Sequence, residues 1–230
     1  VIATLNSIMA FLLLLLIGWS NPLDLQGVIP LEGRGLNPLL QTPAMAIHPP
    51  ALYLGFIGFS VPFAFAMGGL ILGKMDNEWV MTTRRWTLTA WYFLSAGLIL
   101  GGQWAYEELG WGGFWAWDPV ENAAFMPWLT GTAFLHSVMI QEKRNMLKIW
   151  NVVLIILTFG LTIVGTFLTR SGIINSVHAF TQSEIGPAFL IFLAFILVIG
   201  FALLFKRINM LESEHKIDSV LCRENVFLAQ

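Results

Sequence analysis

Six apolar runs, each close to the roughly 20 residues that an α-helix needs to cross a bilayer, divide this 230-residue chain. Only 11% of its residues are charged, against about 25% in a typical soluble domain. Because a bilayer accepts only helices and closed barrels, we predict an all-α integral membrane protein built as an antiparallel bundle of about six transmembrane helices. The runs cover approximately residues 2–19, 51–73, 87–103, 119–141, 149–169 and 186–205, and the shortest, the third, is expected to extend into its neighbours.

The basic residues predict how the bundle is oriented, because lysine and arginine are retained on the cytoplasmic side or its organellar equivalent. Segments 20–50, 104–118 and 170–185 should therefore face outward, toward a periplasm or an intermembrane space. Of the 12 basic residues, only Arg34 and Arg170 fall on that side. The other ten are Lys74, Arg84, Arg85, Lys143, Arg144, Lys148, Lys206, Arg207, Lys216 and Arg223.

Charge and cysteine content exclude several classes of function. A formal net charge of −2, with the basic residues explained by topology, leaves no electrostatic footprint for nucleic acid. Cys222 is the only cysteine, so the chain can form no internal disulfide, no CxxC redox pair and no CxxCH haem attachment site. Any thiol chemistry must come from a partner.

We expect one membrane domain over residues 1–230, with an outer aromatic segment at 104–128 and an inner tail at 206–230. The first apolar run lacks a basic flank and a cleavage site, which favours a retained helix over a signal peptide. The chain has no initiating methionine and stops after a polar segment. These features predict part of a longer protein, or one product of a divided gene.

The stretch WGGFWAWDPVENAAFMPWL, residues 111–129, concentrates aromatic rings beside two carboxylates. Asp118, a proline and Glu121 form a good helix start, which gives both acids a structural role. A tryptophan belt at the membrane boundary explains one or two rings. Gly110, Gly112 and Gly113 are interleaved with the rings and instead favour close approach of the backbone to a flat apolar ligand beside Trp111, Trp115 and Trp117. Both interpretations stay open on spacing alone.

Two histidines are predicted on the outer face, His48 in AIHPPALYLG and His178 in NSVHAF. Pro49 and Pro50 should hold His48 in an extended conformation before the second helix. Two imidazoles above a platform of rings are what six-coordinate haem iron requires. The alternative is that each is a hydrogen-bonded interfacial histidine.

Three other residues could contribute to such a site. Arg34 and Arg170 could pair with haem propionates, although each could equally be a snorkelling interfacial arginine. His136 lies about 27 Å of helix rise past Asp118, inside the bilayer. It could ligate a metal or form a hydrogen bond between helices.

The aromatic stretch closely resembles the tryptophan-rich WWD signature of haem-handling proteins, and its WDPVEN form is similar to the CcmF branch of cytochrome c haem lyases. The similarity extends over roughly residues 20–205. It includes GRGLNPLLQ, HPPALYLGFIGFSVPFAFA, WAYEELGWGG and GTFLTRSGIINSVHAF.

This resemblance implies a function. The family receives haem from the chaperone CcmE and helps join its vinyl groups to the CxxCH cysteines of apocytochrome c, with a thiol-handling CcmH-type subunit as a further partner. It implies that His48 and His178 hold this haem and that His136 is one ligand of a second, intramembrane b-type haem. The second ligand of that haem would come from helices beyond this chain. The residues implied to contact the outer haem are Trp111, Trp115, Trp117 and Asp118.

Other functions remain possible from the sequence. A paralogue dedicated to nitrite-reductase cytochromes and a haem exporter of the CcmC type are the alternatives within haem biology, although DPVEN favours the lyase branch. A polytopic transporter using His136 is the alternative from another class. The resemblance fits the inner membrane of a bacterium or of a mitochondrion, and no residue is an obvious general acid for thioether formation.

Overall fold

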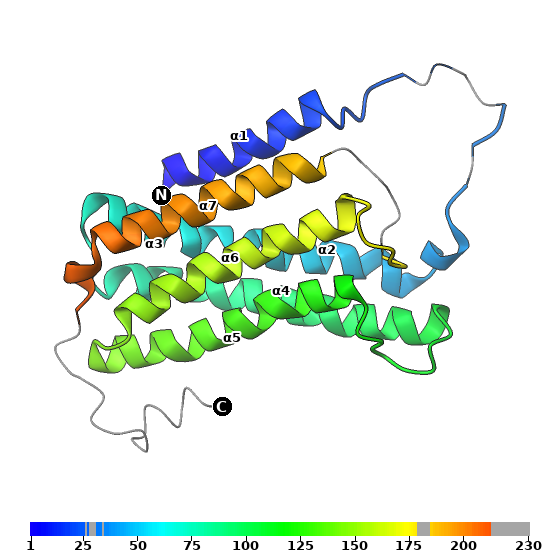
Figure 1. Ribbon diagram of the computed structural model, residues 1–230. Coiled ribbons are helices and arrows are strands. Elements are labelled where there is room, and N and C mark those ends of the chain that lie inside the picture. The colour runs from blue at the N-terminus through cyan, green and yellow to red at the C-terminus, as the bar shows by residue number, and fades with distance from the viewer. Residues whose placement is uncertain (26, 28–30, 34, 179–184, 213–230) are drawn as a thin grey trace.

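The computed structural model describes residues 1–25, 27, 31–33, 35–178 and 185–212. Every regular element in these ranges is helical, so the all-α prediction is confirmed (Figure 1). The α-helices are α1 (Ile2–Gly18), α2 (Pro43–Gly58), α3 (Ser60–Leu72), α4 (Glu78–Glu108), α5 (Pro119–Arg144), α6 (Lys148–Arg170) and α7 (Gly186–Lys206). Two short 3-10 helices, η1 (Pro38–Leu40) and η2 (Ile208–Leu211), complete the described part.

Four helical stretches are long and apolar enough to cross a membrane: α2 together with α3, then α5, α6 and α7. The chain is thus an integral membrane protein. Helix α1 is apolar but has only 17 residues. Helix α4 has 31 residues, which confirms the expected extension of the third run, but threonine, glycine and aromatic residues make it less apolar. Six membrane crossings therefore stay a prediction.

The start of α2 differs from the sequence prediction. The helix begins at Pro43 rather than near residue 51, and the Thr42 side chain caps it by accepting a hydrogen bond from the Met45 backbone. His48 therefore lies inside a helix, and the prediction that it is extended is wrong. Each proline at 49 and 50 removes one backbone hydrogen bond, but packing along α4 keeps the segment helical.

Close contact between α2 and α4 depends on glycine. A Cβ added at Gly55 would lie 2.6 Å from the Leu94 backbone nitrogen, and one added at Gly97 would lie 2.8 Å from the Leu52 backbone. Small residues of this kind let helix backbones approach closely in membranes. The approach brings the first turns of α2 against the second half of α4.

Polar side chains join α5 to its neighbours at the end of the bundle away from residues 109–118. The Gln141 amide donates to Asn77, which precedes α4, over 3.0 Å. Asn151 of α6 donates to the Gln141 carbonyl oxygen over 2.7 Å, and both Gln141 and Asn151 are fully buried. The bonds tie three segments together where an unpaired amide would cost free energy.

The two ends of the bundle carry different chemistry. The connections after α3 and α5 and the end of α7 lie at one end, on the left in Figure 1. The aromatic loop between α4 and α5 and the segment after α6 lie together at the opposite end. This arrangement agrees with the predicted segregation of basic residues.

Labelling of single cysteines tests the predicted orientation. In a Cys222→Ser background, Glu107→Cys should react with a membrane-impermeant thiol reagent in intact cells or vesicles of native orientation. Lys143→Cys should react only after permeabilisation, because it lies at the basic end. Both side chains are exposed, so burial does not limit the reaction. The reverse pattern would contradict the orientation.

Candidate functional site

His48 and His178 come together at the end of the bundle that carries the aromatic loop. They line one small cavity of about 40 Å³, although they are 130 positions apart in the sequence. Its other lining residues are Leu98, Gly101, Gly102, Trp115, Val120 and Glu121. The two predicted ligands are therefore presented to the same space by α2 and by the segment after α6.

Helix α4 orients the His48 ring. Its Nδ1 lies 2.7 Å from the backbone carbonyl oxygen of Gly97. A carbonyl oxygen can only accept, so Nδ1 carries the hydrogen and Nε2 the lone pair. The ring rests on Gly101, where an added Cβ would lie 2.6 Å from His48 Cε1. Glycine at this position leaves room for the imidazole.

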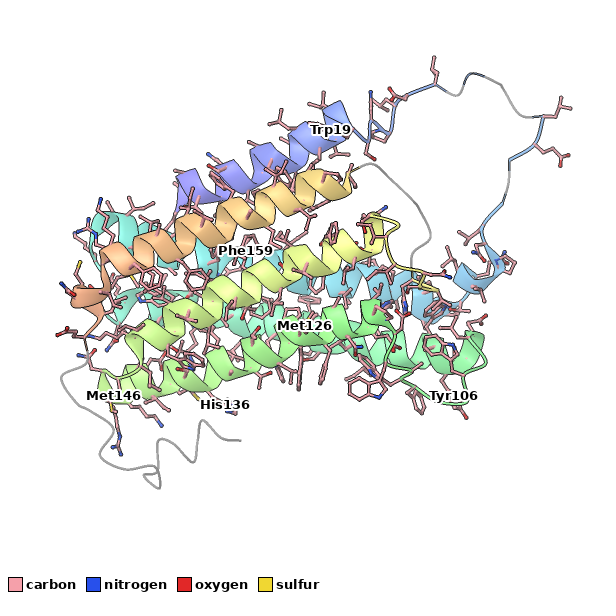
Figure 2. The ribbon with its side chains drawn as sticks, in the orientation of Figure 1. Trp19, Tyr106, Met126, His136, Met146 and Phe159 are labelled. Atoms are coloured by element: carbon pink, nitrogen blue, oxygen red, sulfur yellow. The ribbon has the colours of Figure 1, made fainter. Side chains whose placement is uncertain are left out.

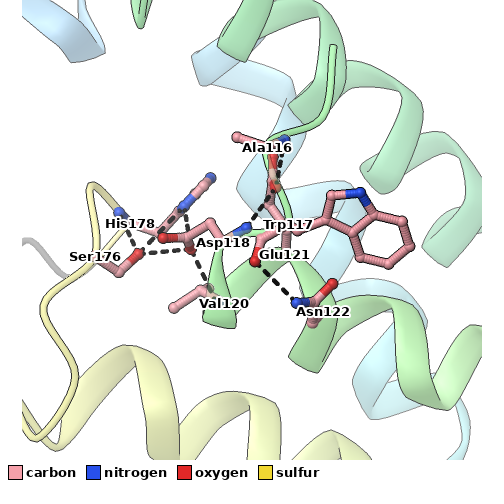
Figure 3. Close-up of polar contacts among 8 residues, drawn as sticks. All are labelled: Ala116, Trp117, Asp118, Val120, Glu121, Asn122, Ser176 and His178. Carbon is pink, nitrogen blue, oxygen red and sulfur yellow. Dashed lines mark hydrogen bonds and ion pairs between the residues drawn. The ribbon is translucent and has the colours of Figure 1, made fainter. Parts of the chain in front are cut away.

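A carboxylate orients the His178 ring (Figure 3). Its Nδ1 lies 3.1 Å from Asp118 Oδ2, and the two side chains are only 12% and 11% exposed. Ser176 Oγ donates to the same oxygen over 2.7 Å and accepts from the His178 backbone N–H over 3.0 Å. Such carboxylate–imidazole pairs fix the tautomer of metal-binding histidines and direct Nε2 outward.

The predicted helix start at Asp118 is confirmed. Asp118 Oδ2 accepts from the Val120 N–H, and Glu121 Oε2 accepts from the Asp118 N–H over 3.0 Å, which completes a capping box. Glu121 Oε2 also accepts from Ala116 N–H over 3.1 Å. Asp118 thus combines the structural role considered for it with the orientation of His178.

Two indoles flank the His178 ring. The Trp104 and His178 ring centroids are 5.3 Å apart, and those of Trp111 and His178 are 6.4 Å apart. Trp104 is fully buried in α4, and its Nε1 donates to the Leu39 carbonyl over 2.7 Å. Trp104 is therefore a core residue and does not belong to an interfacial belt.

A larger cavity of about 560 Å³ adjoins the small one. Leu98, Gly102 and Trp115 line both. Trp115, Trp117, Phe125 and Trp128 form an aromatic wall of the larger cavity, and its other lining residues are Ser95, Leu98, Ile99, Gly102 and Phe114. Its volume lies within the roughly 300–1,000 Å³ of small-molecule sites. Trp115 meets Trp117 and Phe125 edge-on, and Phe125 stacks on Trp128.

Backbone conformation explains part of the glycine pattern in the aromatic loop. Gly110 and Gly112 have φ values of 65° and 72°, which favour glycine without any ligand. Trp117 has φ 59° as well, a conformation that costs a non-glycine residue about 1–3 kcal/mol. Gly113 has neither a positive φ nor an atom within 4 Å of an added Cβ, so a role in ligand approach stays a prediction there.

The remaining predicted residues lie elsewhere. Arg170 is the exposed last residue of α6, at the same end as His178. Arg34 lies outside the described residues. His136 is partly exposed and lies along the lower border of α5 in Figure 2, far along the helix from Asp118. The structure therefore separates His136 from the cavity shared by the other two histidines.

Sequence reasoning missed several residues that shape the site. Ser176 stands two residues before His178, which is a spacing for a local side chain–backbone bond. Gly97 and Gly101 are four residues apart, a small-residue spacing that predicts helix contact. Asn122 donates to the Trp117 carbonyl oxygen over 3.0 Å. No sequence signal shows which backbone group Asn122 binds.

Comparison with known proteins finds relatives in cytochrome c biogenesis. The chain is 52% identical over 196 residues to the cytochrome c-type biogenesis protein CycK of Bradyrhizobium diazoefficiens. The aligned region covers 85% of this chain and 30% of CycK. It is 47% identical over 232 residues to the cytochrome c-type biogenesis protein CcmF of Escherichia coli K12, which covers 100% of this chain and 36% of that protein.

A solved structure of the cytochrome c heme lyase CcmF matches with a TM-score of 0.74 and 37% identity, over 97% of this chain and 32% of that chain. The chain thus spans about a third of the length of these relatives. Its residues 1–174 match the family described as cytochrome C assembly protein. The chain therefore belongs to the cytochrome c assembly protein family, within which it is similar to the CcmF and CycK proteins.

Proposed function

We propose that this chain holds haem at the outer end of the bundle while thioether bonds form with the CxxCH cysteines of apocytochrome c. The observation that carries the proposal is the meeting of two imidazoles in one cavity. Both donate through Nδ1, His48 to a backbone carbonyl and His178 to Asp118. Both Nε2 lone pairs are thereby made available to iron.

The surroundings also fit a haem. The larger cavity is lined almost entirely by apolar and aromatic residues, which suits a flat macrocycle, and the adjoining small cavity holds the two histidines and Glu121. Trp115 lines both cavities, and Trp111 stands beside His178. Haem supplies the vinyl carbons and the partner supplies the thiol, so this chain contributes ligation and orientation. Arg34 and Arg170 are proposed partners of the propionates.

The chain spans about a third of the length of its relatives, so we propose that it acts together with other chains. We assign haem lyase activity to a membrane complex, which contains the helices that match the rest of CcmF. The chaperone CcmE, apocytochrome c and a CcmH-type thiol-handling subunit are its proposed partners, in the inner membrane of a bacterium or a mitochondrion. The single membrane domain, with an outer segment at 104–128 and an inner tail at 206–230, is part of this proposal.

A pyridine haemochrome assay on the purified membrane protein tests the function. We expect haem in the chain co-purified with its partner chains, and apocytochrome c should acquire covalent haem when these are present together. A transporter bundle would contain none. Haem-free protein from haem-replete membranes, in complexes that still mature cytochrome c, would contradict the proposal.

We further propose that His136 ligates an intramembrane b-type haem whose second ligand lies on another helix. His136 is partly exposed on the long helix α5, away from the other histidines. Expressed alone, the chain should lack a low-spin bis-histidine b-haem spectrum assigned to this site. Co-expression with the remaining helices should restore that spectrum, and His136→Ala should abolish it.

Met139→Ala provides a matched control for His136→Ala. Met139 lies one turn further along α5 and is 37% exposed, so its truncation also alters the outward face of the helix. We expect Met139→Ala to retain the restored spectrum. A stoichiometric low-spin b haem that depends on His136 in the isolated chain would contradict a ligand supplied from outside.

A further inference from the structure

Trp117 combines a strained backbone with an exposed side chain. Its φ is 59°, and the residue is 70% exposed, so burial of Trp117 itself offsets little of the cost of this conformation. The conformation nevertheless has a consequence for the cavities. It places the indole on the wall of the larger cavity, edge-on to Trp115, which lines both cavities.

Two side chains in the first turn of α5 hold the backbone around Trp117 (Figure 3). Glu121 is 8% exposed, and its Oε2 accepts from the N–H groups of Ala116 and Asp118, the residues on either side of Trp117. The Asn122 amide donates to the carbonyl oxygen of Trp117 itself. Three consecutive residues of the loop are thus bound by two adjacent residues of one helix.

The same helix start holds His178. Asp118 receives its backbone bond from Glu121 and gives its own carboxylate to the His178 imidazole. Glu121 also lines the cavity that His178 shares with His48. The position of Trp117 and the direction of the His178 ring therefore both depend on one hydrogen-bonded segment, residues 116–122.

We propose that Glu121 and Asn122 are positioning residues, which hold Trp117 in its left-handed conformation and thereby fix the aromatic wall relative to His178. This role rests on the proposed binding of haem at the site. Asn122 lines neither of the two cavities, so its role does not require contact with haem. The contribution of both residues is to keep the indole wall and the imidazole in one relative placement while a covalent bond is made, where small errors in placement slow a reaction strongly.

Amide hydrogen exchange in the purified complex tests whether Glu121 holds the loop backbone, and the readout does not depend on haem. Glu121→Ala frees the N–H groups of Ala116 and Asp118, so their exchange should accelerate roughly tenfold or more. Glu121→Gln keeps an acceptor oxygen and should largely restore protection. Asp76→Ala is a matched control, because Asp76 Oδ1 also accepts a hydrogen bond at a helix start, from the backbone N–H of Glu78 in α4. It should leave residues 116–118 unchanged.

Transfer of haem from the complex to excess apomyoglobin tests the effect on the site. Glu121→Ala and Asn122→Asp should each release haem about tenfold faster, which is the lower end of the effect of losing a direct partner of a metal ligand. Asp76→Ala should not, even if it lowers the melting temperature equally. If Glu121→Ala and Asp76→Ala change release alike, the role is one of general stability and the positioning proposal is wrong.

A double-mutant cycle decides whether Asn122 acts through Trp117. Glycine adopts a positive φ freely, so Trp117→Gly removes the need to hold this backbone. Asn122→Asp should then change haem release less than twofold in the Trp117→Gly background, against about tenfold in the parent. Equal effects in both backgrounds would overturn the proposal. Wild-type protein that binds no haem would instead refute the proposed function. Amide exchange would still show whether Glu121 holds the backbone of residues 116–118.

Discussion

Replacing both His48 and His178 with alanine is expected to abolish haem retention at the outer site and maturation of cytochrome c. The two rings meet in one cavity, and each already uses Nδ1 for a bond to the protein. Each single variant would leave one histidine to hold the haem, so absorption should shift from the low-spin to the high-spin form. Haem content, visible spectra and covalent cytochrome c measured in the same membranes check this.

His215→Ala is the control for these variants, because it removes an imidazole from the charged tail, outside the described residues. It should change neither haem content nor maturation. A double His48→Ala and His178→Ala variant with parental haem content and maturation would show that the ligands lie elsewhere. In that case the shared cavity would be a feature of packing only.

The substitution Gly101→Ala is expected to weaken haem binding roughly tenfold to a hundredfold, although it adds a single methyl group. Its Cβ would lie 2.6 Å from Cε1 and 2.9 Å from Nδ1 of His48, so the imidazole must turn away. Turning breaks the bond to the Gly97 carbonyl that fixes the tautomer. Loss of such an outer partner typically costs about 10–100-fold in metal affinity.

Titration of haem into the purified complex measures this effect. Gly18→Ala is the matched control, because Gly18 ends a helix and its added Cβ meets no atom within 4 Å. It should bind haem as the parent does. Gly101→Ala protein with unchanged affinity and an unchanged low-spin spectrum would show that the His48 ring is not held in the direction that the structure indicates.

The sequence predicted those parts of the fold that depend on local patterns. Apolar runs located both ends of α1, α5, α6 and α7 to within three residues, and Asp118, proline and Glu121 located the start of α5. The start of α2 was not predictable, because Pro49 and Pro50 disfavour a helix locally. Contact with α4 through Gly55 and Gly97 overrides that preference, and such contact has no local signature.

In the site, too, local patterns were predictable and long-range contacts were not. The types of residue and the common side of His48 and His178 followed from motifs and topology. Which group orients each ring did not, since Gly97 lies 49 residues from His48 and Asp118 lies 60 residues from His178. Asn122 was missed for another reason, because its bond depends on the left-handed Trp117, and a tryptophan gives no signal for that conformation.

Helix α5 is fastened at both ends. Its first residues form the capping box and carry the carboxylate bound to His178, while Gln141 near its last turn is bound to Asn77 and Asn151. The helix therefore cannot slide or rotate about its axis without breaking bonds at one end or the other. His136 and the carboxylate that orients His178 thus lie on one helix that is bound at both ends, so a shift of α5 along its axis would displace both together.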